Sequence, residues 1–251
     1  MDKLLDGFLE RIEYRGSTDV SLDTLSAIQR QHLAVVPYEN LDMLHRIPLA
    51  FETERLWDKI VARKRGGVCY ELNFLLGDML RRMGFNLDFL SGIVAGGAGG
   101  DFAHALLLVH LPEGDYITDV GFSRGYLAPL RLSVGWQNDG RFDYRLRQEG
   151  DWYLLERRHS EKGPVEEYRF TLTPRQREEY REMCDYLCGA PNCKFTYMLV
   201  CSRELPEGRL TLRDDFLMME PIGGEAYTTP VEDRAETDRL LREKFGLEAN
   251  R

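Results

Sequence analysis

The chain has 251 residues, and its 42 acidic side chains outnumber 33 Lys and Arg, which gives a formal net charge of −9. This acidic balance argues against nucleic acid or an anionic membrane surface as the main partner. With 43% hydrophobic and 30% charged residues, and no apolar segment near the ~20 residues that span a bilayer, the composition is typical of a soluble globular protein with a large core.

Residues 1–85 are predicted to form a helical bundle. Apolar residues recur at helical spacing in four segments, 3–14, 22–33, 56–61 and 72–83. Ser21 is placed to cap the second helix, and Gly84 suits the left-handed residue that follows the end of the fourth. The N-terminal residues carry no basic segment followed by an apolar one, so no signal peptide is predicted.

Cys69 lies directly behind a glycine pair and at the start of the fourth helix. The unpaired backbone N–H groups and the macrodipole at a helix N-terminus favour the thiolate, the form of cysteine that attacks acyl groups. A single cysteine is more often a buried structural thiol, so this position makes Cys69 only a candidate nucleophile. Arg65 and Glu71 are expected to form a structural ion pair that fastens the loop before it.

From residue 86 the pattern changes to short β-type runs separated by Gly, Pro and charged turns. The predicted strands are 88–95, 105–111, 116–120, 142–146, 152–156 and 167–172. They predict a small antiparallel barrel or sandwich within residues 86–188. The glycine cluster at 96–100 lacks the Lys-Ser/Thr of a phosphate-binding loop, and we expect a flexible strand connection at the rim of an active site.

The second and third of these strands carry the partners that a nucleophilic cysteine needs. His104 precedes one strand and Asp119 lies in the other, and both project from the same face if paired residue numbers add up to an odd value. A turn centred on Leu111–Pro112 would place them opposite each other, whereas one centred on Glu113–Gly114 would offset them by four residues. With Cys69 they predict a nucleophile, a base and a carboxylate that orients the imidazole.

The last third of the chain returns to a mixed pattern. Helices are predicted at 174–187 and 233–245, and strands at 196–202 and 209–212. Residues 189–251 are predicted to form an α/β lid. Four cysteines cluster at 184, 188, 193 and 201, but their spacings lack the paired C-x2-C of structural zinc sites, so no metal is predicted. Five cysteines in all, an odd number, fit a reducing compartment, and we expect a cytoplasmic protein.

The sequence resembles the arylamine N-acetyltransferases across its first half. The matching segments, in family order and spacing, are Glu10–Ile12, Val36–Leu41, Lys59–Val61, Arg65–Asn73, His104–Val109 and Asp119–Phe122. The Arg-Gly-Gly-x-Cys-x-Glu-Leu-Asn block is highly specific, and Cys69, His104 and Asp119 match the family's catalytic residues. The second half matches more loosely. The chain departs from the family at Tyr38, where phenylalanine is usual, and at Ser123, where glycine is usual.

The resemblance implies an α+β fold of several domains, with an N-terminal helical bundle, a central antiparallel β-barrel and a C-terminal α/β lid around a Cys-His-Asp core like that of cysteine proteases. It implies acetyl transfer from acetyl-CoA to an arylamine, hydrazine or arylhydroxylamine through a cysteinyl thioester, without a metal. By resemblance the acceptor pocket would be lined by Tyr38, Val68, Phe102 and Phe122. The cofactor's pyrophosphate would lie near Ser123, Arg124, Gly125 and Tyr126.

Other chemistry uses the same order of residues. A thiol peptidase or a transglutaminase-like enzyme would also need Cys, His and Asp, and an amide synthase acting on a tethered acyl chain is a close variant within the family. A binding protein without turnover is a third alternative, although it has no chemical need for all three residues. For an oxyanion hole we expect the backbone N–H groups of Cys69 and Ala103. The natural acceptor amine and the oligomeric state stay open.

Overall fold

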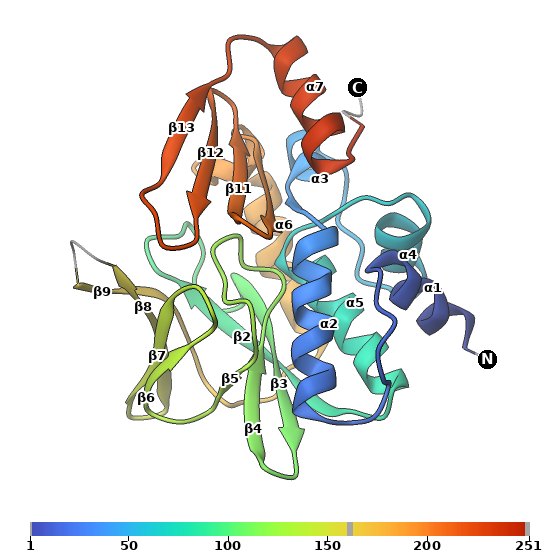
Figure 1. The fold of residues 1–251 in the computed structure, drawn as a ribbon, viewed down its shortest axis with the longest axis vertical. Helices are drawn as coiled ribbons and strands as arrows, with labels where there is room; N and C mark the ends of the chain where they lie inside the picture. The colour runs from blue at the N-terminus through green and yellow to red at the C-terminus, as the bar shows by residue number, and fades with distance from the viewer. Residues whose placement is uncertain (1, 160–162, 249–251) are drawn as a thin grey trace.

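A computed structural model describes residues 2–159 and 163–248 of the chain (Figure 1). Its helices are α1 (Lys3–Arg11), α2 (Leu22–Val35), α3 (Leu41–Leu44), α4 (Thr53–Trp57), α5 (Cys69–Arg82), α6 (Arg181–Gly189) and α7 (Arg234–Phe245). Ser21 caps α2 as predicted, because its hydroxyl accepts a hydrogen bond from the Thr24 N–H at 3.2 Å. Gly84 follows the end of α5 with φ 98°, which confirms the predicted left-handed residue there.

Eight strands form one antiparallel sheet in the order β5-β4-β3-β2-β9-β8-β7-β6. Their bounds are β2 Asn86–Val94, β3 His104–Leu111, β4 Gly114–Thr118, β5 Leu130–Arg131, β6 Gly135–Asn138, β7 Asp143–Glu149, β8 Trp152–His159 and β9 Gly163–Phe170. The Gln137 side chain accepts the Arg131 N–H and donates to the Arg131 carbonyl, both at 2.8 Å, and so joins the two edge strands. The sheet is therefore a nearly closed barrel, as the sequence predicts.

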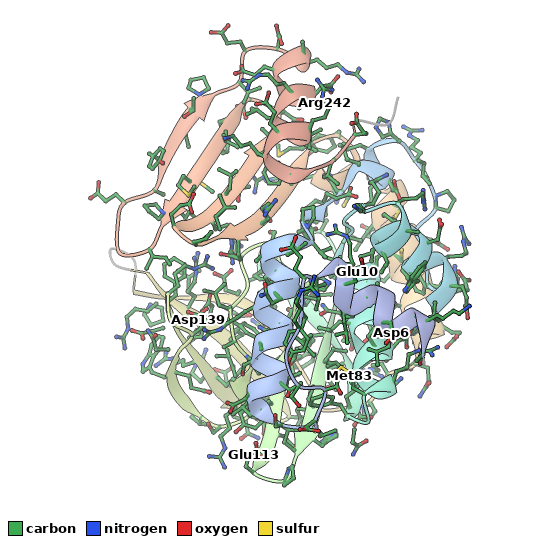
Figure 2. All side chains as sticks on the ribbon, turned by 45° about the vertical axis from the view of Figure 1, so that its right-hand side comes forward. Asp6, Glu10, Met83, Glu113, Asp139 and Arg242 are labelled. Atoms are coloured by element: carbon green, nitrogen blue, oxygen red, sulfur yellow. The ribbon has the colours of Figure 1, made fainter. Side chains whose placement is uncertain are left out.

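The β3–β4 hairpin fixes how His104 and Asp119 face each other. It pairs Leu107 with Thr118 and Leu111 with Gly114, numbers that add up to an odd value, so both side chains project from the same face. The turn is centred between the two positions considered from sequence, and the offset of His104 from Asp119 is two residues rather than none or four. Figure 2 shows Glu113 at the tip of this hairpin and Arg242, on α7, at the other end of the molecule.

A second sheet joins the beginning of the chain to its end. It has the order β1-β10-β11-β12-β13, with β1 (Tyr38–Glu39), β10 (Val200–Leu205), β11 (Gly208–Arg213), β12 (Phe216–Pro221) and β13 (Tyr227–Pro230). Asn40 holds this junction, since its side chain donates to the carbonyls of Phe195 and Met198 and accepts the Val200 N–H, each at 2.8 Å. Asn40, two residues after Tyr38, thus fixes the position at which β10 begins.

Helix α6 packs against the N-terminal helices. Tyr180, in the 3₁₀ turn before α6, meets Phe74 of α5 edge to face with ring centroids 5.2 Å apart, and both side chains are fully buried. One apolar cluster therefore runs from α1 through α5 and into α6. The division of the chain at residues 85 and 188 stays a prediction. None of the described helices has the length and apolar character needed to cross a membrane.

Candidate active site

Cys69 is the first residue of α5, and only 8% of it is exposed. The Glu71 carboxylate accepts the Val68 N–H at 3.2 Å and so satisfies one of the open donors at this helix start. The Cys69 N–H belongs to the first turn of the helix, where no intrahelical acceptor exists. The Cys69 Sγ lies 4.0 Å from the carbonyl oxygen of Ala103, the residue that precedes β3.

A buried ionic network fastens the loop that leads to Cys69. Arg65 contacts Glu39 and Asp42, both at 2.8 Å, and Lys59 contacts Asp42 at 2.7 Å and Glu71 at 2.8 Å. The predicted pair between Arg65 and Glu71 is therefore wrong, because each takes its own partner of opposite charge. Arg65 still ties the cysteine loop to β1 and α3, and Glu71 ties it to Lys59 in the π-helix that follows α4 (Asp58–Ala62).

His104 and Asp119 form a buried pair. The His104 Nε2 lies 2.7 Å from the Asp119 Oδ2, and the two residues are 2% and 0% exposed. Burial alone lowers the pKa of His104, but the charge of Asp119, its hydrogen bond and a side-chain hydrogen bond with Cys69 outweigh burial and raise that pKa to about 10. The imidazole therefore holds its proton at neutral pH between a carboxylate and the thiol.

Two residues that the sequence did not single out hold the carboxylate of Asp119. The Asn73 side chain donates to Oδ1 at 2.8 Å, and the Tyr168 hydroxyl donates to Oδ2 at 3.2 Å. Asn73 stands four residues after Cys69, one helical turn on the same face, and this spacing was available as a signal. Tyr168 comes from β9 on the far side of β2, and no local pattern points to it.

Gly121 permits the close approach of the Asp119 segment to α5. A Cβ at Gly121 would lie 2.5 Å from the Cys69 Cα and 2.7 Å from the Asn73 Nδ2, closer than real side chains come. The Gly121 N–H also donates to the Asp119 Oδ1 at 2.8 Å. The glycine therefore lets nucleophile and carboxylate share one small space.

A cleft of about 430 Å³ opens over Cys69 and His104. Four of the expected binding residues line it, namely Tyr38, Phe122, Ser123 and Arg124. The glycine segment at 96–99 forms part of its rim, and the segment at 192–195 contributes to its wall. The cleft thus runs from the nucleophile between the barrel-like sheet and the second sheet.

The other four expected binding residues lie away from the lining of the cleft in the described structure. Val68 is buried at the start of α5, and Phe102, at φ 65°, turns its ring to Tyr180 with centroids 5.2 Å apart. Tyr126 is fully buried with its hydroxyl 3.3 Å from that of Tyr168. Residues adjacent in sequence to the lining thus face other parts of the chain, and their predicted binding roles stay predictions.

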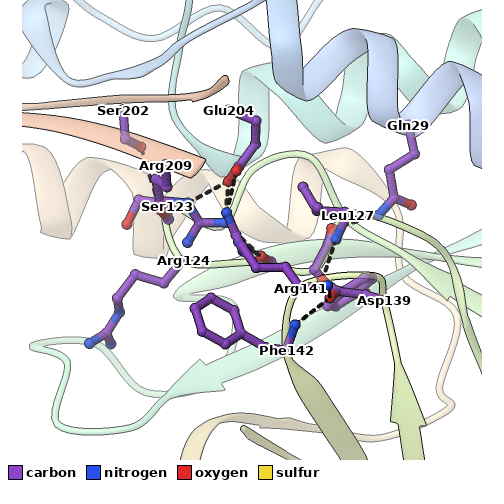
Figure 3. A network of polar contacts seen from close by, with 12 residues as sticks. Gln29, Ser123, Arg124, Leu127, Asp139, Arg141, Phe142, Ser202, Glu204 and Arg209 are labelled. Carbon is purple, nitrogen blue, oxygen red and sulfur yellow. Dashed lines mark hydrogen bonds and ion pairs between the residues drawn. The ribbon is translucent and has the colours of Figure 1, made fainter. Parts of the chain in front are cut away.

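A polar network holds the backbone of Gly125 in place. Its carbonyl accepts hydrogen bonds from Arg209 at 2.7 Å and from Tyr144 at 3.2 Å. Figure 3 shows Arg141 and Arg209 meeting at Glu204, while Arg124 extends away from this group. The network ties the segment after Asp119 to β10 and β11.

Two other predictions from the sequence concern the hydrogen-bond donors of an oxyanion hole and the absence of a metal site. The Ala103 N–H donates to the Gly100 carbonyl at 3.2 Å, so it is not available as an oxyanion donor, and that expectation is corrected. Cys184, Cys188, Cys193 and Cys201 are free thiols. Across residues 2–159 and 163–248, no group of three His, Cys, Asp or Glu side chains has an arrangement that could hold a metal ion.

Comparison with known proteins mainly finds N-acetyltransferases. A family model described as N-acetyltransferase matches residues 21–251. An arylamine N-acetyltransferase of Escherichia coli is 34% identical over 253 residues, covering 98% of this chain and 90% of the relative. The solved arylamine N-acetyltransferase of Salmonella typhimurium superposes with a TM-score of 0.92 at 31% identity, covering 100% of this chain and 93% of that one. That of Mycobacterium marinum in complex with CoA gives 0.90 at 32% identity, covering 96% and 92%.

Proposed function

The chain belongs to the arylamine N-acetyltransferases, a family of transferases, and we propose that it moves an acetyl group from acetyl-CoA to an arylamine, hydrazine or arylhydroxylamine through a thioester on Cys69. The observation that carries this proposal is that Cys69 and His104 line one cleft and that the buried Asp119 contacts the His104 imidazole. The CoA complex of the Mycobacterium marinum relative supports the choice of donor.

In the first half of the reaction the Cys69 thiolate attacks the acetyl carbonyl carbon. His104, which holds a proton at neutral pH because Asp119 and Cys69 raise its pKa to about 10, gives that proton to the departing CoA sulfur. The bond between the carbonyl carbon and that sulfur breaks, and the acetyl group stays on Cys69. Asp119 keeps the imidazole in one orientation throughout.

In the second half the amine nitrogen attacks the acetyl carbon on Cys69. Neutral His104 accepts the proton that the nitrogen loses, the bond from carbon to the Cys69 sulfur breaks, and the thiolate and imidazolium are restored. Negative charge on the carbonyl oxygen in both halves would be met by the Cys69 N–H at the start of α5. Phe122, whose ring lies 5.5 Å from the His104 ring, would form an apolar wall for the acceptor.

The family assignment favours acetyl transfer over a thiol peptidase or transglutaminase-like reaction. Those reactions use an amide substrate rather than a CoA thioester, so the donor separates them. An amide synthase acting on a tethered acyl chain uses the same three residues and differs in the acyl group and acceptor. Acetyl-CoA alone therefore tests the proposal.

The test is intact mass measurement after mixing the protein with acetyl-CoA and no acceptor. We expect a gain of one acetyl group, located on Cys69 by peptide mapping, and its loss when an arylamine such as 4-methoxyaniline is added. Cys69→Ser should abolish labelling, while Cys188→Ser, a matched change at a half-buried thiol of α6, should retain it. Labelling that survives Cys69→Ser would contradict the proposal.

A further inference from the structure

Two cysteines stand one helical turn apart on α6. Cys184 and Cys188 are four positions apart, so their side chains lie on the same face of the helix. The two side chains share a hydrogen bond. In the described structure the lining of the cleft over Cys69 includes Cys193 but neither of these two. Cys184 and Cys188 therefore form a pair of thiols of their own, apart from the nucleophile.

The shared hydrogen bond makes the two thiols unequal. It is the largest cause that lowers the pKa of Cys188 and raises that of Cys184, so the Cys184 S–H donates and the Cys188 sulfur accepts. Burial and the charges of Asp185 and Glu71 oppose a thiolate at Cys188. The negative end of the helix dipole opposes it too, so the Cys184 S–H is what stabilises it. Because the thiolate is the form of cysteine that reacts with oxidants, Cys188 is the more reactive of the two.

Exposure separates the two sulfurs in the same sense. Cys188 is half-buried, whereas only 3% of Cys184 is exposed. An oxidant in solution can therefore reach Cys188, while Cys184 is shielded but stays in hydrogen-bond contact with it. Redox-sensitive cysteines commonly combine a lowered pKa, access to solvent and a second thiol beside them. Cys188 has all three properties.

The end of α6 leaves room for the two sulfurs to bond. Cα atoms four positions apart in a helix are about 6.2 Å from each other, within the range of disulfides, but their Cβ atoms, at roughly 5 to 6 Å, are farther apart than in a relaxed disulfide. The last turn must therefore tighten. The helix ends at Gly189, where an added Cβ would meet no atom within 4 Å, so there is space beside this turn. A bond closed against such strain is readily reduced.

We propose that Cys184 and Cys188 are a modification site, at which a hydroperoxide converts the two thiols into a reversible disulfide. The Cys188 thiolate attacks one peroxide oxygen, the O–O bond breaks, and the departing oxygen takes up a proton, which leaves a sulfenic acid on Cys188. The Cys184 sulfur then attacks the Cys188 sulfur, the S–O bond breaks, and the hydroxyl group leaves with the Cys184 proton as water. The two thiols together lose two electrons, and the peroxide is reduced to water and an alcohol, or to two waters from hydrogen peroxide.

Cys193 is the other thiol close to Cys188. Their charges interact, but burial is the main cause that raises the pKa of Cys193, and its sulfur accepts the Phe195 N–H. Cys184 is the thiol that already shares a hydrogen bond with Cys188. We therefore expect Cys184, and not Cys193, to close the disulfide.

The test treats the reduced Cys69→Ser protein with a small excess of hydrogen peroxide and then blocks the remaining thiols with N-ethylmaleimide. Without the sulfur at position 69, oxidation of the other four thiols is followed alone. We expect intact mass measurement to show two of those four unlabelled, and dithiothreitol to restore both. In the tryptic peptide 182–194, which contains three of them, the label should lie on Cys193 alone. Peptide mapping of the oxidised wild-type protein should find the same bond.

Variants assign the roles of the two sulfurs. In Cys184→Ser we expect a sulfenic acid on Cys188 that dimedone traps, because no thiol in contact condenses with it. In Cys188→Ser the same dose of peroxide should leave Cys184 reduced. Cys193→Ser, a matched change at a buried thiol outside the pair, should form the disulfide as before.

Three outcomes would overturn the proposal. The first is a disulfide that contains Cys193 in the Cys69→Ser protein. The second is a slow loss of all four thiols at similar rates, as expected of ordinary cysteines. The third is a Cys188 sulfenic acid that persists although Cys184 is present. Because Cys69 is absent from this test, its result is independent of the proposed acetyl transfer.

Discussion

Two histidines are buried almost equally in this protein, yet their pKa values move in opposite directions. His104 is 2% exposed and its pKa is raised to about 10, while His32 of α2 is 0% exposed and burial, aided by the charge of Arg11, lowers its pKa to about 3. Neither ring nitrogen of His32 has a hydrogen-bond partner among the described residues. Burial disfavours the charged ring in both places, and at His104 the buried carboxylate, together with Cys69, reverses that effect.

The comparison predicts that His104 will behave like His32 once its carboxylate is removed. In Asp119→Asn the amide can still accept from the Asn73 side chain and the Gly121 N–H, but it no longer stabilises an imidazolium. We expect acetylation of Cys69 to slow by roughly 10² to 10⁴. The pKa of His104, followed by NMR, should fall from its raised value.

A matched control lies on the same hairpin. Asp115 contacts His110 at 2.7 Å, but both side chains are partly exposed, and Asp115→Asn should leave acetylation unchanged. Near-normal acetylation by a folded Asp119→Asn protein would show that Asp119 is structural. The catalytic unit would then be reduced to Cys69 and His104.

The second prediction concerns the other histidine and the stability of the fold. Because the folded pKa of His32 is about 3 and the unfolded value is about 6.5, the unfolded chain binds one proton more between these pH values. The contribution of neutral His32 to stability is present above pH 6.5 and is lost as pH falls toward 3. Between pH 6.5 and 4.5 this loss amounts to about 2 kcal/mol.

The variant His32→Leu tests this loss of stability even though its core packing differs from that of the wild type. The variant carries some fixed packing cost, since the His32 ring contacts Phe8 with centroids 6.0 Å apart, but that cost does not depend on pH. Urea unfolding at pH 7, 6 and 5 should show the wild-type free energy of unfolding falling relative to that of the variant. Parallel pH profiles for the two proteins would mean that His32 does not set the acid sensitivity.

The same contrast shows what sequence could predict. Cys69 was found from a helix start, and the shared face of His104 and Asp119 from strand alternation, because both rules act over a few residues. Tyr168 was missed, since β9 reaches the site only by pairing with β2, some seventy residues away in sequence. Nothing local distinguishes His32 from a functional histidine either, because only the surrounding structure shows whether a carboxylate faces it.

The second sheet illustrates another limit. Strands β12 and β13 were not predicted, and all of their residues are half-buried or exposed, so no alternation marks them. The resemblance could not show that Val68, Phe102, Gly125 and Tyr126 lie outside the lining of the cleft, because it gives order along the chain and not the direction in which each residue faces.

The last prediction is that the reactivity of Cys69 hardly changes with pH. Because His104 keeps its proton until pH approaches 10, an imidazolium stays beside the Cys69 sulfur across the neutral range. We expect the rate of Cys69 alkylation by iodoacetamide to be nearly the same at pH 6 and pH 8.5. An ordinary thiol, with a pKa of roughly 8.5, would react far more slowly at pH 6.

Peptide mapping assigns the label to Cys69, and the Cys69→Ser protein gives the background from the other four thiols. In Asp119→Asn the imidazolium loses its support, so alkylation should regain the steep rise with pH of a free thiol. A wild-type rate that already rises in that way would show that the buried carboxylate raises the pKa of His104 without activating the sulfur.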